Sequence, residues 1–459
     1  LMVVFLGACV TGNIDSGDSD TDVDTDTDTD TDTDTDTDIC NAAVPCAGDF
    51  DIDSAISLDS ITQCEIITGV LTIDDQDWLT SLDLPCLKTV DGQLNFNGND
   101  ALTSIGLYRL AFVSGQLSII ENSALTNLDG LSSLSSVGNN LGIEENDALT
   151  NLDGLSSLSS VGNNLGIEGN DALTNLDGLS SLSSVGYDVS IRENEVLTNV
   201  DGLSSLASVG RLIIWFNRTL TNLDGLANLT SIGSDLDIHY SSALINLDGL
   251  SNLNYLGRNL TIYGAGEITN LDALSKLTSV NDLNITSNND LANLDGLSNL
   301  TIVDGDLSII FHDVLTNLDG LAGLTTVGGC LSIEVNDALT SLEGAANLTS
   351  VGNLVIEENK VLTDLLPTLN TVGNNLAIRE NNALTNLDDL STLTTIGNNL
   401  VIRLNRKLTS LDGLSNVTSV GGDLDIFDNE DLCQSEVDAF VGGLTVNGTV
   451  TTYGNDDDC

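Results

Sequence analysis

The sequence predicts an all-β, single-domain parallel β-solenoid of about 16 coils, with capped ends and a disordered N-terminal tail. The first observation behind this prediction is an internal repeat. The 24-residue unit that starts at Ala124 is followed by a second copy, from Ala148 to Asp171, that differs from it at one position. Variants of the unit recur at steps of 22 to 24 residues, and they start at Trp78, Ala101, Ala124, Ala148, Ala172, Val196, Thr219, Ala243, Glu267, Asp290, Val314, Ala338, Val361, Ala383, Lys407 and Asp431.

The second observation is the spacing of the apolar residues within one unit. Leu125 begins a series of apolar residues at steps of three that ends at Val137, a spacing that suits a loosely turning backbone. Leu141 and Ile143 then alternate with small or polar residues, which is the period of a short strand with one buried face. A single coil cannot bury these side chains, so we expect the coils to stack with their strands paired in parallel, about 4.8 Å apart.

The third observation is a column of asparagines at the end of the expected strands. Because a buried turn must satisfy its backbone groups, we expect a ladder in which each side-chain amide bonds backbone groups of its own coil and of the next one. This column is interpreted as structural and not as a binding site. Its members are Asn99, Asn122, Asn146, Asn170, Asn194, Asn217, Asn288, Asn336, Asn359, Asn381, Asn405 and Asn429.

A column of acidic residues occupies the Leu-Asp-Gly turn of the units. These carboxylates are expected to face water and to accept backbone hydrogen bonds, while the glycine supplies the bend. A weak, calcium-lined ridge is the alternative reading, but the sequence predicts no defined metal site and no cofactor. The column consists of Asp129, Asp153, Asp177, Asp201, Asp224, Asp248, Asp272, Asp295, Asp319, Glu343, Asp388 and Asp412.

The N-terminal residues precede the repeat. Residues 1–9 form a short apolar run that ends in LGAC and resembles the lipobox of bacterial lipoproteins, which implies that Cys9 is lipidated and that the protein is anchored at the outer membrane or cell surface. Residues 10–39 are mostly alternating threonine and aspartate, a composition that predicts a disordered, extended linker. We expect a disulfide-rich N-terminal cap at residues 40–70, solenoid repeats at 71–432 and a C-terminal cap at 433–459.

The eight cysteines indicate how the two ends are held. Cys433 and Cys459 bracket the C-terminal cap, which is expected to contain a short helix and a closing strand, and we expect these two residues to form a disulfide. The four N-terminal cysteines are expected to pair among themselves, with three connectivities open. Bracketing disulfides of this kind indicate a secreted protein. Cys330 is left over and is expected to be a buried free thiol. The N-terminal four are Cys40, Cys46, Cys64 and Cys86.

Candidate binding residues occur where the outward positions of the strands depart from the repeat. Coils toward the two ends of the row carry charged residues there, but the middle coils carry aromatic or apolar ones, although only 3% of the chain is aromatic. The asparagine column also lapses in these coils, at Ser241, Ala265 and His312, and we expect both histidines of the chain, His239 and His312, to lie at this surface. Rings at this spacing are expected to form a continuous platform that stacks on sugar rings or anchors a protein. We define the aromatic patch as Trp215, Phe216, His239, Tyr240, Tyr263, Ile310 and Phe311.

The unit LTNLDGLSSLSSVGNNLGIEEN resembles the repeat of the receptor L-domain, a leucine-rich-repeat-like solenoid of receptor ectodomains that also occurs in bacterial surface proteins. The resemblance covers about residues 64–432, and Cys64 followed by IITGVLTI is similar to the cysteine-bearing entry of that family. The receptor domains have far fewer coils than this chain. The resemblance implies a recognition scaffold without catalytic residues, and it brings no known ligand.

These features together favour a monomeric, lipid-anchored binding or adhesion module that recognises a glycan or a surface protein. The formal net charge of −57 excludes a basic nucleic-acid-binding surface, and it leaves the lipid anchor as the only expected contact with a membrane. A structural envelope spacer without a specific ligand is the alternative. A carbohydrate-active enzyme is the weaker third hypothesis, because Asp237 and His239 could form an acid–base pair but have no accompanying nucleophile.

Overall fold

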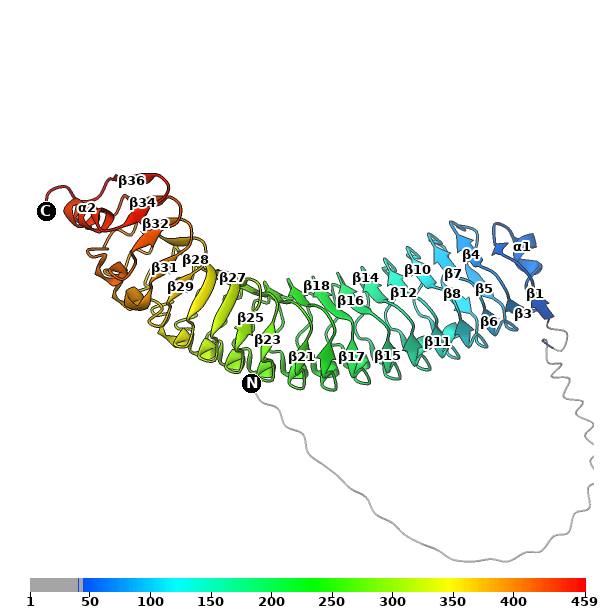
Figure 1. Cartoon of the computed structure of the whole chain (residues 1–459). Coiled ribbons are helices and arrows are strands. Elements are labelled where there is room, and N and C mark those ends of the chain that lie inside the picture. The colour runs from blue at the N-terminus through cyan, green and yellow to red at the C-terminus, as the bar shows by residue number, and fades with distance from the viewer. Residues whose placement is uncertain (1–39, 41–43) are drawn as a thin grey trace, which may run out of the picture.

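Stacked coils form one continuous arc in the computed structural model, which describes residue 40 and residues 44–459 (Figure 1). The predicted lipidation residue Cys9 and the threonine–aspartate linker lie outside the described residues. The architecture is the predicted parallel β-solenoid of leucine-rich-repeat-like type. Within the described residues, no helix has both the length and the apolar composition needed to cross a bilayer.

The main ladder of parallel strands follows the concave edge of the arc (Figure 1). Each of the predicted repeat units contributes one strand, and β2 and β4 add two more from the segment before Trp78. The ladder runs through β2 (Phe50–Asp51), β4 (Leu71–Asp74), β7 (Leu94–Asn97), β10 (Leu117–Ile120), β12 (Leu141–Glu144), β14 (Leu165–Glu168), β16 (Asp188–Arg192), β18 (Arg211–Trp215), β20 (Leu236–His239), β22 (Leu260–Tyr263), β24 (Leu283–Thr286), β26 (Leu307–Ile310), β27 (Thr326–Glu334), β28 (Ser350–Glu357), β30 (Leu376–Arg379), β32 (Leu400–Arg403), β34 (Leu424–Phe427) and β36 (Val450–Tyr453).

Shorter strands follow the opposite, convex side of the arc and also pair in parallel (Figure 1). The long strands β27 and β28 belong to both sides, and β5 (Ser81–Asp83) pairs with β8 (Ser104–Gly106). The convex strands are β1 (Val44–Cys46), β3 (Cys64–Ile67), β6 (Thr89–Val90), β9 (Phe112–Val113), β11 (Ser136–Val137), β13 (Ser160–Val161), β15 (Ser184–Val185), β17 (Ser208–Val209), β19 (Ser231–Ile232), β21 (Tyr255–Leu256), β23 (Ser279–Val280), β25 (Ile302–Val303), β29 (Thr371–Val372), β31 (Thr395–Ile396), β33 (Ser419–Val420) and β35 (Thr445–Val446).

A short 3₁₀-helix forms the return turn of most coils. The three-residue spacing of the leucines was expected to reflect a loose turn; the 3₁₀-helix covers only three residues of this stretch, and the rest is turns and irregular backbone. The 3₁₀-helices are η1 (Asp129–Leu131), η2 (Asp153–Leu155), η3 (Asp177–Leu179), η4 (Asp201–Leu203), η5 (Asp224–Leu226), η6 (Asp248–Leu250), η7 (Asp272–Leu274), η8 (Asp295–Leu297), η9 (Asp319–Leu321), η10 (Glu343–Ala345), η11 (Asp388–Thr392) and η12 (Asp412–Leu414).

The aspartate was expected to accept backbone hydrogen bonds and the glycine to supply the bend, and both of these predictions are wrong. Asp153 is exposed, as expected, but its backbone N–H donates to the Oδ1 atom of Asn151 at 3.1 Å, so the asparagine side chain closes the turn. Gly154 has no left-handed backbone; it is needed because a Cβ atom there would overlap the carbonyl oxygen of Leu128 in the preceding coil.

The leucines, isoleucines and valines of all coils form one continuous core, and the asparagine ladder runs beside it. The Nδ2 atom of Asn146 donates to the Ile119 carbonyl of the preceding coil at 2.9 Å and to the Glu144 carbonyl of its own coil at 3.0 Å. The backbone N–H of Asn146 donates to Oδ1 of Asn170 in the next coil at 3.1 Å. This confirms the predicted ladder and shows that each amide also bonds the preceding coil.

Both ends are closed by helices and disulfides. At the N-terminal end, α1 (Ala55–Asp59) has a capping box at Ser54, and the disulfides are Cys40–Cys86 and Cys46–Cys64, which settles the open connectivity. At the C-terminal end, α2 (Gln434–Gly442) precedes β35 and β36, and the predicted Cys433–Cys459 disulfide is present.

Cys330 is a free thiol, as predicted, but it is only half-buried. It lies at the rim of a groove on the concave face instead of in the core, and burial raises the pKa of its thiol.

Candidate functional site

Five aromatic side chains of the predicted patch lie in contact on the concave face. Parallel pairing of β18, β20 and β22 places Trp215, His239 and Tyr263 in register at the last residue of each strand. The ring centroids of Trp215 and His239 are 4.8 Å apart, and those of His239 and Tyr263 are 5.8 Å apart. The row follows from the repeat, because equivalent positions of successive coils stack above one another.

A second row lies beside the first, at the residue after each strand. Phe216 (φ 55°) and Tyr240 (φ 50°) have left-handed backbones there, and Gly264 (φ 66°) takes the same place in the next coil. The Phe216 and Tyr240 rings stack at 4.7 Å, and Tyr240 meets Tyr263 edge-on at 4.8 Å. A left-handed backbone costs a residue with a side chain about 1 kcal/mol relative to glycine. The left-handed backbone therefore does not explain why Phe216 and Tyr240 are aromatic. We call Trp215, Phe216, His239, Tyr240 and Tyr263 the aromatic cluster.

The rings of the cluster are inclined to one another to different degrees. Phe216 and Tyr240 are only 17° from parallel, so each ring covers one face of the other. The guanidinium carbon of Arg192 lies 4.4 Å from the centroid of the Trp215 ring and covers that ring from the preceding coil. The other neighbouring rings are inclined to one another, Trp215 and His239 by 44°, His239 and Tyr263 by 43°, and Tyr240 and Tyr263 by 83°.

Two residues of the predicted patch lie apart from the cluster. Ile310 and Phe311 belong to the coil of β26, and the coil of β24, with Thr286 and Ser287 at the equivalent positions, separates them from Tyr263. Phe311 is half exposed. The structure therefore brings five of the seven predicted residues together.

The prediction that His312 lies at the surface was wrong. Its side chain is 0% exposed and takes the place of an asparagine in the ladder. Nδ1 lies 3.0 Å from the Asn288 carbonyl oxygen, and Nε2 lies 3.1 Å from the Ile285 carbonyl oxygen. Burial lowers the pKa of His312 below its ordinary value.

Asp237, which could have formed an acid–base pair with His239, binds Arg211. Nε and Nη2 of Arg211 donate to Oδ2 of Asp237 at 2.9 and 2.5 Å, and Asp237 is buried beneath this contact. Burial lowers the pKa of His239, Asp237 opposes that shift, and Arg211 adds to it. Within the described residues no hydrogen bond joins Asp237 to His239, so the carboxylate acts as the partner of an arginine.

One group of carboxylates has the spacing of cation ligands. Glu357, Glu358 and Glu380 each offer an oxygen, and these oxygens lie within 4.8 Å of one another. Arg379 already binds Glu357, with 2.9 Å between Nη1 and Oε2, so part of this charge is neutralised by the protein itself.

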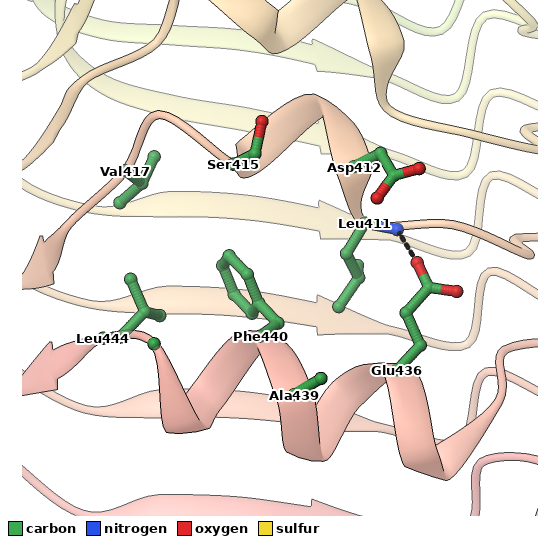
Figure 2. Close-up of a pocket in the computed structure, with 9 residues that line it drawn as sticks. Leu411, Asp412, Ser415, Val417, Glu436, Ala439, Phe440 and Leu444 are labelled. Atoms are coloured by element: carbon green, nitrogen blue, oxygen red, sulfur yellow. Dashed lines mark hydrogen bonds between the residues drawn. The ribbon is translucent and has the colours of Figure 1, made fainter.

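A pocket of about 270 Å³ lies at the C-terminal cap, between η12 and α2. Figure 2 shows Phe440 and Leu444 of the helix side facing Leu411 and Val417 of the last repeat. Oε1 of Glu436 accepts a hydrogen bond from the backbone N–H of Leu411 at 2.6 Å. The sequence did not predict this pocket; the available signal was Glu436, an acidic residue in the first turn of the predicted cap helix. Its contacts join the cap to the solenoid.

The chain is similar to solved structures only at low sequence identity. No family model and no curated protein matches the chain. An internalin from Listeria monocytogenes is 19% identical, with 69% of this chain and 82% of that chain covered and a TM-score of 0.38. A leucine-rich-repeat protein from Leptospira interrogans is 16% identical, with 88% and 100% covered and a TM-score of 0.35.

Proposed function

We propose that this chain is a binding protein that recognises a protein partner on its concave face, through the aromatic cluster. The observation that carries the proposal is the contact of five aromatic side chains, in neighbouring coils, in a chain that is only 3% aromatic. These side chains are partly exposed, with Tyr240 at 41%, so core packing does not account for them. Partly exposed aromatic residues are typical anchors of protein interfaces.

The arrangement of the rings favours a protein over a glycan. A sugar ring stacks on an exposed aromatic face, whereas here Phe216 and Tyr240 cover one face of each other and Arg192 covers a face of Trp215. Ring edges and the grooves between them fit apolar side chains of a partner.

Asp237 is held by Arg211, and we infer that the protein is not an enzyme.

We also propose that the protein is displayed at the cell surface, in a role similar to that of receptor L-domains. Lipidation of Cys9 would anchor it, and the threonine–aspartate linker would separate the solenoid from the membrane. Three disulfides among the described residues agree with an oxidising compartment. Replacing Cys9 with serine should abolish metabolic labelling with a fatty acid and release the protein from the membrane fraction.

The binding proposal is tested with the full chain on two arrays, one of purified extracellular proteins and one of polysaccharides. Wild type is expected to bind discrete spots on the protein array, and Phe216→Ala/Tyr240→Ala is expected to lose them. Phe427→Ala/Tyr453→Ala is the matched control, because these rings also stack on the concave face, 5.0 Å apart at 15°, but outside the cluster.

Each alternative has its own result on these arrays. Equal retention by all three chains would contradict a role for the aromatic cluster. Selective binding to polysaccharides that requires Phe216 and Tyr240 would replace the protein partner with a glycan. An absence of any specific binding would favour the structural spacer.

A further inference from the structure

A polar groove of about 320 Å³ leads along the concave face to the aromatic cluster. Its floor is open because Gly142 and Gly166 carry no side chain at the outward position of β12 and β14. Asn140 and Asn164 line one side, and the groove continues to Arg192, which stacks on Trp215. The groove and the cluster are therefore parts of one continuous surface.

Glu144 lies over this glycine floor. Its Oε1 atom is 3.0 Å from the position that a Cβ atom on Gly142 would occupy, and 3.4 Å from that of a Cβ on Gly166. Pairing of β12 with β14 places Glu168 directly beside Glu144. Burial raises the pKa of Glu144, the charges of Glu168 and Glu145 raise it further, and the charge of Arg192 partly opposes this shift.

The carboxylates of this pair lack partners within the protein. In the part of the chain that the structure describes, neither Glu144 nor Glu168 makes a side-chain hydrogen bond or an ion pair. Arg192 follows Glu168 in the same row, but its guanidinium stacks on Trp215. Two like charges side by side on neighbouring strands destabilise a sheet unless a cation lies between them.

The same row contains a second glutamate pair whose carboxylates have partners within the protein. Glu334 and Glu357 are partners in β27 and β28, as Glu144 and Glu168 are in β12 and β14. Glu334 accepts a hydrogen bond from the Ser332 hydroxyl, at the position that is Gly142 in the first pair. Glu357 binds Arg379, the residue equivalent to Arg192. The two pairs thus differ in what lies around them and not in their place in the repeat.

We infer that the groove at Glu144 and Glu168 takes a lysine or arginine side chain of the protein partner, while an adjacent apolar side chain of that partner packs against the aromatic cluster. This inference rests on the proposed function and names the chemistry of the partner. The unpaired carboxylates supply the complementary charge, and the glycine floor supplies the room for a long side chain. Arg192 is held at the end of the groove by Trp215, so the Glu144 carboxylate over Gly142 and Gly166 has no ion-pair partner among the described residues. Charge complementarity of this kind fixes the orientation of a partner and speeds its association.

The test uses the full chain and a fluorescein-labelled peptide of alternating lysine and leucine, with a glutamate–leucine peptide as the acidic counterpart. Anisotropy is measured at about 0.15 M salt, where long-range attraction to the acidic linker is screened. Glu144→Gln/Glu168→Gln should weaken binding of the basic peptide about tenfold. Glu334→Gln/Glu357→Gln removes the same charge from the same row and should change binding less than about twofold.

The outcomes separate the inference from the function on which it rests. Equal losses from the two glutamine pairs, or no loss from either, would overturn the groove inference. Loss of the peptide by Phe216→Ala/Tyr240→Ala, with retention by Glu144→Gln/Glu168→Gln, would support the aromatic cluster and overturn the groove. The reverse pattern would support the groove and count against the cluster.

Discussion

Replacing His312 with asparagine should stabilise the solenoid, because the histidine leaves buried polar atoms unmatched. Both ring nitrogens face carbonyl oxygens, those of Asn288 and Ile285. A neutral imidazole has one N–H and can donate to only one of them. Burial lowers the pKa of His312, so the neutral form prevails near neutral pH. In addition, Oδ1 of Asn336 in the next coil is buried without a hydrogen-bond partner.

The size of the stabilisation by His312→Asn follows from the hydrogen bonds that asparagine makes elsewhere in the ladder. Nδ2 of Asn122 donates to the Phe96 and Ile120 carbonyls and lies 3.1 Å from Oδ1 of Asn146. An asparagine at position 312 would remove the ring nitrogen that faces a carbonyl oxygen without a hydrogen, and it would supply a donor for Asn336; each change is worth about 1 kcal/mol net. Loss of the larger ring offsets about 1 kcal/mol of this gain. The expected net stabilisation is about 1 kcal/mol.

Urea unfolding at about pH 7.5, above the ordinary histidine pKa, gives the global effect, and hydrogen exchange of peptides that cover β26 and β27 gives the local one. Exchange is needed because the coils of a solenoid can open separately. His239→Asn is the control, since His239 lies outside the ladder, and it should leave stability nearly unchanged. A variant His312→Asn that is less stable than wild type, or that exchanges faster over β26 and β27, would refute the reasoning.

Three further predictions concern the ladder, the turn and pH. Asn146→Ala removes the side-chain hydrogen bonds of Asn146 to the preceding coil, its own coil and the next coil, and should lower the free energy of unfolding by about 3 kcal/mol, seen as faster exchange over β10, β12 and β14. Gly154→Ala, which would overlap the Leu128 carbonyl, should lower the thermal midpoint clearly, whereas Ala273→Gly, at the same turn position of another coil, should change it little. The folded-state pKa values of His239 and His312 lie below the ordinary 6.5, so the unfolded chain binds more protons below that pH. The contribution of the two histidines to the free energy of unfolding is therefore complete above about pH 6.5. It is lost on acidification. His312→Asn should reduce this loss in urea unfolding measured across that range.

The repeat allowed the architecture and the rows of the site to be predicted from the sequence. A period of 22 to 24 residues specifies which residues lie above one another, and so it placed Trp215, His239 and Tyr263 in one row and the asparagines in a ladder. The pattern does not specify what a departure from the repeat means. His312 departs from asparagine and proved to be its substitute in the core, whereas Trp215 departs from glutamate and lies on the surface.

Features that depend on side-chain orientation could not be predicted in this way. The stacking of Phe216 on Tyr240 follows from ring rotation, which a row of letters does not contain. The difference between the two glutamate pairs depends on whether an arginine turns toward a carboxylate, as Arg379 does, or toward an aromatic ring, as Arg192 does. The order glutamate, glutamate, arginine in three successive coils is the same for both pairs, so the sequence does not predict which way the arginine turns.

The most direct test of a partner-binding concave face is hydroxyl-radical footprinting of the full chain, free and bound to a protein identified on the array. Oxidation of Trp215, Phe216, Tyr240 and Tyr263 is then compared with that of Phe427 and Tyr453. The account predicts that the partner lowers oxidation at the first four side chains and leaves the last two unchanged. Unchanged oxidation of the first four, with protection only on the convex side or at the caps, would contradict it.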